Sequence, residues 1–183
     1  MGTAINVGAV LVGTLLGVLL QGRLPLRARE TVMNGLGALT IVIGLSMAFQ
    51  SASLLVVMGA VLLGSIVGEI IGIERWLERL GDRFEARLTR PGATSTFSMG
   101  FVTASLLFCV GAMTVVGSLN AGMGDHSMLY AKSVLDLIAA AMLSVSLGVG
   151  VMLSAAFVLV FQGAIALFAG VLRPLLSEAA IAE

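Results

Sequence analysis

Long apolar runs, separated by short polar segments, make up most of this chain. Crossing the roughly 30 Å apolar core of a bilayer takes about 20 mainly apolar residues in a helix, because lipid cannot satisfy an open backbone. The pattern therefore predicts an all-α, polytopic transmembrane helical bundle of about six spans in one domain, residues 1–183. The predicted spans are Ala4–Leu20, Val32–Phe49, Ser53–Ile73, Phe97–Leu119, Tyr130–Gly150 and Val151–Leu172. The last two abut near Gly148 and Gly150, which favour a tight turn.

One polar segment has a helical periodicity of its own. Within Glu74–Leu88, apolar residues recur every four positions among arginines and acids, at Trp76, Leu80, Phe84 and Leu88. This spacing predicts a short amphipathic helix, and tryptophan is typical of the membrane interface. We expect this helix and its linker, residues 74–96, on the cytoplasmic surface. Two interpretations remain open: a solvated connector, or a helix that docks a partner or senses lipid.

The basic residues predict an orientation. Eight of the ten Lys and Arg residues lie in two segments, residues 21–31 and 74–96. With the predicted spans, both segments emerge on the same face of the membrane. Positively charged loops remain in the cytoplasm, so the Arg-rich loops 21–31 and 74–96 are expected inside and the N-terminus outside.

Composition supports a membrane protein and excludes several other classes. Hydrophobic residues make up 58% of the chain and charged residues 11%, with a net charge of zero. Soluble domains have about 45–50% and 25%, so the lipid bilayer is the expected partner and nucleic acid is not. No catalytic, phosphate-binding or His/Cys cluster motif is present, which argues against an enzyme, a cofactor or a metal site.

A glycine pattern occurs twice. Val7–Gly17 (VGAVLVGTLLG) and Met58–Gly68 (MGAVLLGSIVG) match closely. Small residues at such spacing let helix backbones approach, which also permits a homo-oligomer; a backbone-lined permeation path is the alternative. The predicted packing residues are Gly8, Gly13, Gly17, Gly59, Gly64, Gly68 and Gly72. A weaker echo between Gly163–Leu175 and Gly17–Leu26 runs in the opposite direction, as in the inverted repeats of many transporters.

Ionisable residues within a span are the main candidates for chemistry, because burying charge in lipid is costly. Lys132 and Asp136 lie four residues apart, so they share one helix face and can pair. With Ser133 and Glu69 they form the candidate ion or substrate pathway. The alternatives are a structural pair near the outer interface, with Lys132 reaching towards water, and a Glu69 that faces headgroups or pairs with a loop arginine.

The predicted outer loop contains a second candidate site. Asn120, Asp125 and His126 lie between the fourth and fifth spans. A metal site needs three or four ligands, so one histidine and one aspartate do not make one. A turn followed by a helix N-cap at Asp125 or Ser127 is the favoured interpretation.

Two stretches carry specific motifs: GFVTASLLFCVGAM at Gly100–Met113 and GDHSMLYAKSVLD at Gly124–Asp136. Shorter ones are found at Met1–Thr3, Glu30–Gly37 and Gly68–Glu69. In these motifs the chain resembles, over essentially its whole length, the YqgA/YdfK-type family of uncharacterised bacterial multi-spanning inner-membrane proteins. The resemblance implies a multi-pass protein of the bacterial inner membrane, without a settled substrate.

The resemblance also bears on particular residues. The family's motifs include the positions of Asp125, His126, Lys132 and Asp136. Members usually continue past the position of Glu183 with further spans, so the resemblance implies a C-terminus that is short relative to the family.

Two hypotheses for function follow. The leading one is a protein that moves a small solute or ion, with Lys132 and Asp136 near the path. The alternative is a structural or accessory membrane protein that docks a partner through its cytoplasmic helix.

Overall fold

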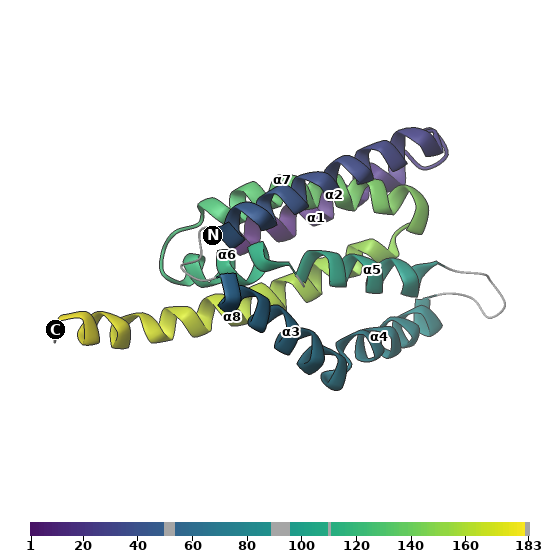
Figure 1. Ribbon diagram of the computed structural model, residues 1–183. Helices are drawn as coiled ribbons and strands as arrows, with labels where there is room; N and C mark the ends of the chain where they lie inside the picture. The colour runs from purple at the N-terminus through teal and green to yellow at the C-terminus, as the bar shows by residue number, and fades with distance from the viewer. Residues whose placement is uncertain (50–53, 89–95, 110, 182–183) are drawn as a thin grey trace.

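The computed structural model describes residues 1–49, 54–88, 96–109 and 111–181, and within these ranges every regular element is a helix. The helices are α1 (Gly2–Leu19), α2 (Leu26–Phe49), α3 (Leu54–Ile71), α4 (Ile73–Leu88), α5 (Phe97–Cys109), α6 (Ala112–Gly122), α7 (Ser127–Leu147) and α8 (Gly150–Ile181). Figure 1 shows them as an elongated bundle from which the C-terminal part of α8 projects. The predicted all-α membrane bundle is confirmed.

The number of spans is close to the predicted one. Within the part of the chain that the structure describes, four helices are long and apolar enough to cross a membrane: α1, α2, α7 and the first part of α8, Gly150–Val171. The pair α5–α6 makes a fifth if it is counted as one span, and the apolar part of α3, Met58–Ile71, is shorter. The prediction of about six spans is therefore approximate.

The predicted fourth span, Phe97–Leu119, is not one straight helix. It is divided into α5 and α6, whose axes are bent by 60° at the break. Gly111 caps α6 in an extended conformation, and its carbonyl accepts a hydrogen bond from the Thr114 amide at 2.9 Å. A broken span leaves backbone groups without helical partners at membrane depth, which is tolerated only inside protein or beside a cavity.

The closest helix contact is between α1 and α7. A Cβ on Gly13 would lie 2.3 Å from the Leu137 carbonyl oxygen, and one on Gly17 would lie 2.1 Å from that of Ala141. The two backbones therefore touch because these positions have no side chain. The contacts advance together along both helices, so α1 and α7 run parallel.

The helix α8 completes the packed part of the bundle. It packs against α5, α6 and α1, and the core between them includes Val10, Phe108 and Val151, none more than 1% exposed. The turn between α7 and α8 passes through Gly148, whose φ of 69° favours glycine. A Cβ on Gly150 would lie 2.2 Å from the Phe97 carbonyl oxygen, so α8 begins directly against the start of α5.

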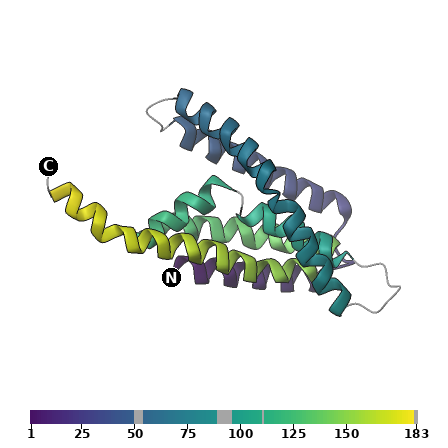
Figure 2. The same ribbon diagram turned by 90° about the horizontal axis from the view of Figure 1, so that it is seen from below.

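The hairpin of α2 and α3 lies at the periphery. No residue of α2 is buried, although this helix contacts α7. Figure 2 shows α2 and α3 on the side of the bundle opposite α1. The glycines of α3 that were predicted to pack, Gly59, Gly64 and Gly68, have no neighbour within 4 Å of a Cβ, and the same is true of Gly8 in α1. Gly72, with φ of 64°, lies in the turn between α3 and α4.

The amphipathic helix α4 packs on the bundle through α5. Leu77 is fully buried with Phe101, and a Cβ on Gly81 would lie 2.7 Å from the Ser98 hydroxyl oxygen. Trp76 is 52% exposed, with its ring 6.2 Å from that of Phe157. The predicted positions of the Phe84 and Leu88 side chains, and the linker over residues 89–95, lie outside the described residues.

Candidate functional site

The site is built on a buried ion pair in α7. Lys132 and Asp136, 5% and 6% exposed, lie one turn apart, and the Lys132 ammonium donates to the Asp136 Oδ2 atom. To reach Asp136, the Lys132 side chain runs towards the C-terminal end of α7. Because Lys132 is buried, its side chain lies inside the bundle. Ser133, also buried, donates to the Leu129 carbonyl at 2.7 Å and stays bound to its own helix.

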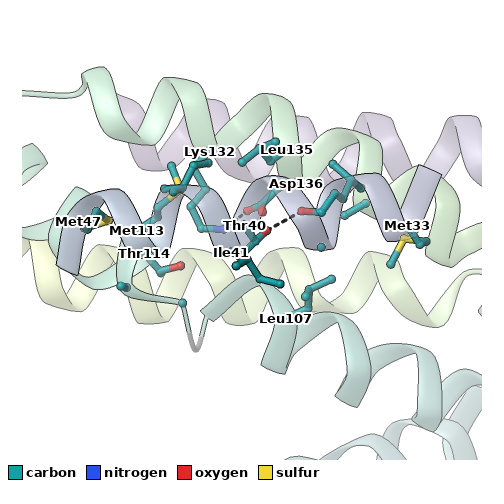
Figure 3. A pocket seen from close by; sticks show the side chains of 17 residues that line it. Met33, Thr40, Ile41, Met47, Leu107, Met113, Thr114, Lys132, Leu135 and Asp136 are labelled. Carbon is teal, nitrogen blue, oxygen red and sulfur yellow. Dashed lines mark hydrogen bonds and ion pairs between the residues drawn. The ribbon is translucent and has the colours of Figure 1, made fainter. Parts of the chain in front are cut away.

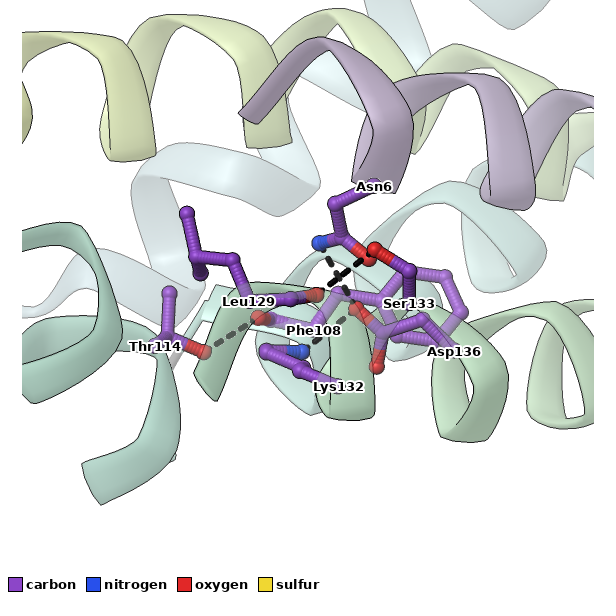
Figure 4. Close-up of polar contacts among 7 residues, drawn as sticks. All are labelled: Asn6, Phe108, Thr114, Leu129, Lys132, Ser133 and Asp136. Carbon is purple, nitrogen blue, oxygen red and sulfur yellow. Dashed lines mark hydrogen bonds and ion pairs between the residues drawn. The ribbon is translucent and has the colours of Figure 1, made fainter. Parts of the chain in front are cut away.

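Asn6 of α1 reaches the pair from across the helix interface. Its Nδ2 group donates to Asp136 Oδ2 at 3.0 Å, over 130 positions of sequence (Figure 4). The close approach at Gly13 and Gly17 brings α1 near enough for this bond. An amide in a span can bond to a neighbouring helix, but the sequence does not identify the partner of Asn6. The Asn6 Oδ1 atom is buried and, among the described residues, has no hydrogen-bonding partner.

The break between α5 and α6 lies beside the pair. The Lys132 ammonium is 5.8 Å from the centre of the Phe108 ring, a cation–π contact, near the end of α5. Thr114, in the first turn of α6, donates from its hydroxyl to the Phe108 carbonyl at 2.7 Å, as Figure 4 shows. The hydroxyl thus satisfies a carbonyl freed by the break. Neither residue was a sequence candidate, because both lie in an apolar run that predicts a continuous span.

A pocket of about 430 Å³ opens on one side of the pair. Figure 3 shows Lys132 and Asp136 near Thr40 and Ile41 of α2, with Leu107 of α5 lower in the view. The lining residues are Met33, Leu36, Gly37, Thr40, Ile41, Ile43, Gly44, Met47, Leu107, Gly111, Ala112, Met113, Thr114, Lys132, Leu135, Asp136 and Ala139. Pockets of this size hold small organic ligands. Nothing in the pattern of α2 identified it as the wall, because its apolar residues are equally suited to facing lipid.

The other predicted pathway residue lies elsewhere. Glu69, at the end of α3, is outside the pocket, and its side chain is 87% exposed. It is 3.8 Å from the guanidinium of Arg75, the arginine pairing that was the alternative interpretation. Such exposed pairs contribute little to stability. Glu69 therefore does not join Lys132, Asp136 and Ser133.

The outer-loop residues form a turn that starts α7. The Asn120 carbonyl accepts a hydrogen bond from the Asp125 amide at 2.9 Å, and the Asp125 carboxylate accepts one from the Ser127 amide at 2.9 Å. This bond from the Ser127 backbone holds the pKa of Asp125 below its ordinary value. His126 precedes the helix, with its ring 6.2 Å from that of Tyr130. Among the described residues, no group of three His, Cys, Asp or Glu side chains could hold a metal ion.

Comparison with known proteins agrees with a membrane location. The family described as "Protein of unknown function (DUF554)" matches residues 1–183. Over its whole length the chain is 33% identical to "Uncharacterized protein YqgA" of Escherichia coli (strain K12), covering 80% of that protein. It is 25% identical to "Uncharacterized membrane protein YdfK" of Bacillus subtilis (strain 168), covering 78%. No solved structure matches the chain.

Proposed function

The chain belongs to the DUF554 family of membrane proteins of unknown function, and we propose that it moves a small solute or ion across the membrane. The predicted family resemblance is thereby confirmed. The observation that carries the proposal is the pocket that reaches the buried Lys132–Asp136 pair beside the α5–α6 break.

Three features of this site support transport. Charged residues inside a membrane are costly and usually face a pathway, and both members of this pair line the pocket. Transporters often place their substrate site at broken helices, whose free backbone groups face a cavity. The wall formed by α2 has no buried residue, so it is the part of the site held least firmly by packing. A solute could enter or leave by displacement of this wall.

The proposal includes the bacterial inner membrane, with the N-terminus outside and residues 21–31 and 74–96 in the cytoplasm. Its support is the clustering of arginines in those two segments. Cysteine labelling tests the orientation, since Cys109 is the one cysteine of the chain and is buried. In a Cys109→Ala background, an impermeant maleimide should label Met123→Cys on intact cells and Arg27→Cys only after lysis. The reverse pattern would invert the orientation.

The direct test is flux into proteoliposomes. Protein reconstituted in lipid vesicles is assayed with simple ions and a panel of small metabolites, beside Asp136→Asn. We expect flux of at least one solute, and a loss of about tenfold or more in the variant, because Asp136 accepts the hydrogen bonds of both Lys132 and Asn6. The matched control is Glu69→Gln, which neutralises an exposed acid outside the pocket and should leave flux unchanged. Absence of any flux from folded protein would contradict the proposal.

The alternative function, partner docking through α4, has less support. The buried side of α4 already packs on α5 through Leu77 and Gly81, so that side is not free for a partner. The exposed Trp76 is also a usual feature of a helix at the membrane interface.

A further inference from the structure

The chemistry of the pocket restricts what it can bind. Among the described residues that line it, only Thr40, Thr114, Lys132 and Asp136 have polar side chains. The Thr40 hydroxyl donates to the Leu36 carbonyl at 2.9 Å, and Thr114 donates to the Phe108 carbonyl. Both hydroxyl protons are therefore used within the protein. Recognition of a polar group in the ligand falls to the ion pair.

The ion pair has unused hydrogen-bonding capacity of both signs. An ammonium has three N–H donors, and in the described part of the chain Lys132 uses one, towards Asp136 Oδ2. The Asn6 amide donates to the same oxygen, so no described residue donates to Oδ1. Lys132 and Asp136 both line the pocket, so the N–H groups and the carboxylate oxygen that these contacts leave over belong to one wall of it.

Charge balance selects among ligands. The pair is neutral as a whole, so a ligand of net charge would leave an uncompensated charge inside the membrane, which is costly. A divalent cation would also need about six oxygen ligands, and the described lining of the pocket offers a single carboxylate. A ligand that carries both a positive and a negative group uses both partners and keeps the site neutral. The remaining walls are apolar and suit a hydrocarbon body.

We propose that this pocket binds a small zwitterion with an apolar body, of the class of aliphatic α-amino acids. The ligand's ammonium donates to Asp136 Oδ1, and its carboxylate accepts from Lys132. Its side chain lies between α2 and the α5–α6 break, against Ile41 and Met113. This inference rests on the proposed function, in that it names the solute that would be transported.

Equilibrium binding tests the inference without any need for transport. Purified protein in detergent is titrated with radiolabelled L-leucine, and unlabelled analogues compete. Isocaproate lacks the ammonium and isoamylamine lacks the carboxylate, so each should compete about tenfold or more less well than leucine. Glycine lacks the apolar body and should also be weaker by at least about tenfold. Isocaproate that competes as well as leucine would overturn the zwitterion in favour of a simple carboxylate.

A matched pair of variants places the binding in this pocket without touching the ion pair. Gly44 lines the pocket, and a Cβ there would have no neighbour within 4 Å, so Gly44→Leu is expected to place its side chain in the pocket. Gly35, on the same helix, has equally open space but does not line the pocket. We expect Gly44→Leu to reduce leucine binding about tenfold or more and Gly35→Leu to leave it unchanged. Equal effects of the two would overturn the assignment.

Binding and flux together separate this inference from the proposed function. Saturable leucine binding without flux would support the binding site and contradict transport. Flux of another solute, lost in Asp136→Asn, with no leucine binding to the same folded protein, would support transport and overturn the ligand class.

Discussion

The helices α1 and α3 share one glycine pattern but have different surroundings. Val7–Gly17 and Met58–Gly68 match at their glycines, and even a local side-chain bond is repeated. Thr14 donates to the Val10 carbonyl and Ser65 donates to the Val61 carbonyl, both at 2.8 Å. Local structure is therefore the same in both helices.

The environment of the repeated residues differs. Val10 is fully buried while Val61, its counterpart, is 62% exposed. Gly13 and Gly17 touch the backbone of α7, whereas Gly64 and Gly68 of α3 have nothing near them. The glycine pattern makes close packing feasible, but the partner decides whether it occurs. The α1 copy has α7, and this contact brings Asn6 to the buried carboxylate.

The largest expected effect comes from Gly17→Leu. Its Cβ would lie 2.1 Å from the Ala141 carbonyl oxygen, and backbone cannot move aside without separating the two helices. We expect a loss of more than about 4 kcal/mol in unfolding free energy, beyond usual overpacking. Denaturant unfolding in mixed micelles measures it.

The control is the same change at the matching position of α3. Gly68→Leu meets open space and should alter the unfolding free energy by less than about 0.5 kcal/mol. A large loss of unfolding free energy at Gly68 instead would mean that α3 also packs through its glycines, as in the homo-oligomer that the glycine spacing permits.

This contrast marks what could be predicted from sequence. Hydropathy located the helices well: α1 was predicted at Ala4–Leu20 and lies at Gly2–Leu19. It could not reveal the break near Gly111, because glycine and its apolar neighbours are tolerated in membrane helices and do not lower the hydropathy of the run. Nor could spacing show that Leu77 is fully buried while Trp76 is 52% exposed, since both residues fit an apolar stripe.

The sequence predicts only the part of the candidate site that does not depend on how the helices pack. Lys132 and Asp136 stand out because charge is rare in a span, and their spacing alone predicts a pair. Asn6 was indistinguishable from other amides, because its bond to Asp136 depends on how α1 and α7 pack. The α2 wall depends on tertiary structure in the same way.

The second largest effect should come from breaking the Lys132–Asp136 ion pair, which α1 contacts through Asn6. Lys132→Met leaves Asp136 buried without its cation and should cost about 3 kcal/mol of unfolding free energy. The double variant Lys132→Met/Asp136→Leu should recover most of that loss, because no buried charge remains. If the double variant is as unstable as the single one, packing of the lysine stem matters more than its charge.

A smaller effect is expected when α1 is made more like α3. When the two copies of the repeat are aligned, Val57 of α3 corresponds to Asn6 of α1. The variant Asn6→Val therefore introduces the α3 residue into α1. This removes one hydrogen bond to Asp136 and should cost about 1 kcal/mol, typical of polar contacts between membrane helices. Unfolding in the same micelles measures it. No loss would show that glycine contact alone stabilises the α1–α7 interface.

The smallest effect is expected where the α1–α7 interface begins. Gly2 of α1 lies against Leu129 in the first turn of α7, and the Asp125 carboxylate holds that turn through the Ser127 amide. This bond, with smaller contributions from the Ser127 side chain and then from His126, lowers the pKa of Asp125 from its ordinary 3.8. A lowered pKa means that the stabilisation is complete above pH 3.8 and is lost as the pH falls through the lowered value.

Hydrogen exchange of the peptide that begins α7 should therefore lose some protection below pH 3.8, while peptides of α3 keep theirs. Asp125→Asn keeps an acceptor oxygen and should remove the pH dependence, whereas Asp125→Ala should show the lower protection at every pH. Because Asp125 is fully exposed, the change should be confined to this first turn. If protection were lost along the whole of α7, the turn at Asp125 would instead control the entire contact that distinguishes α1 from α3.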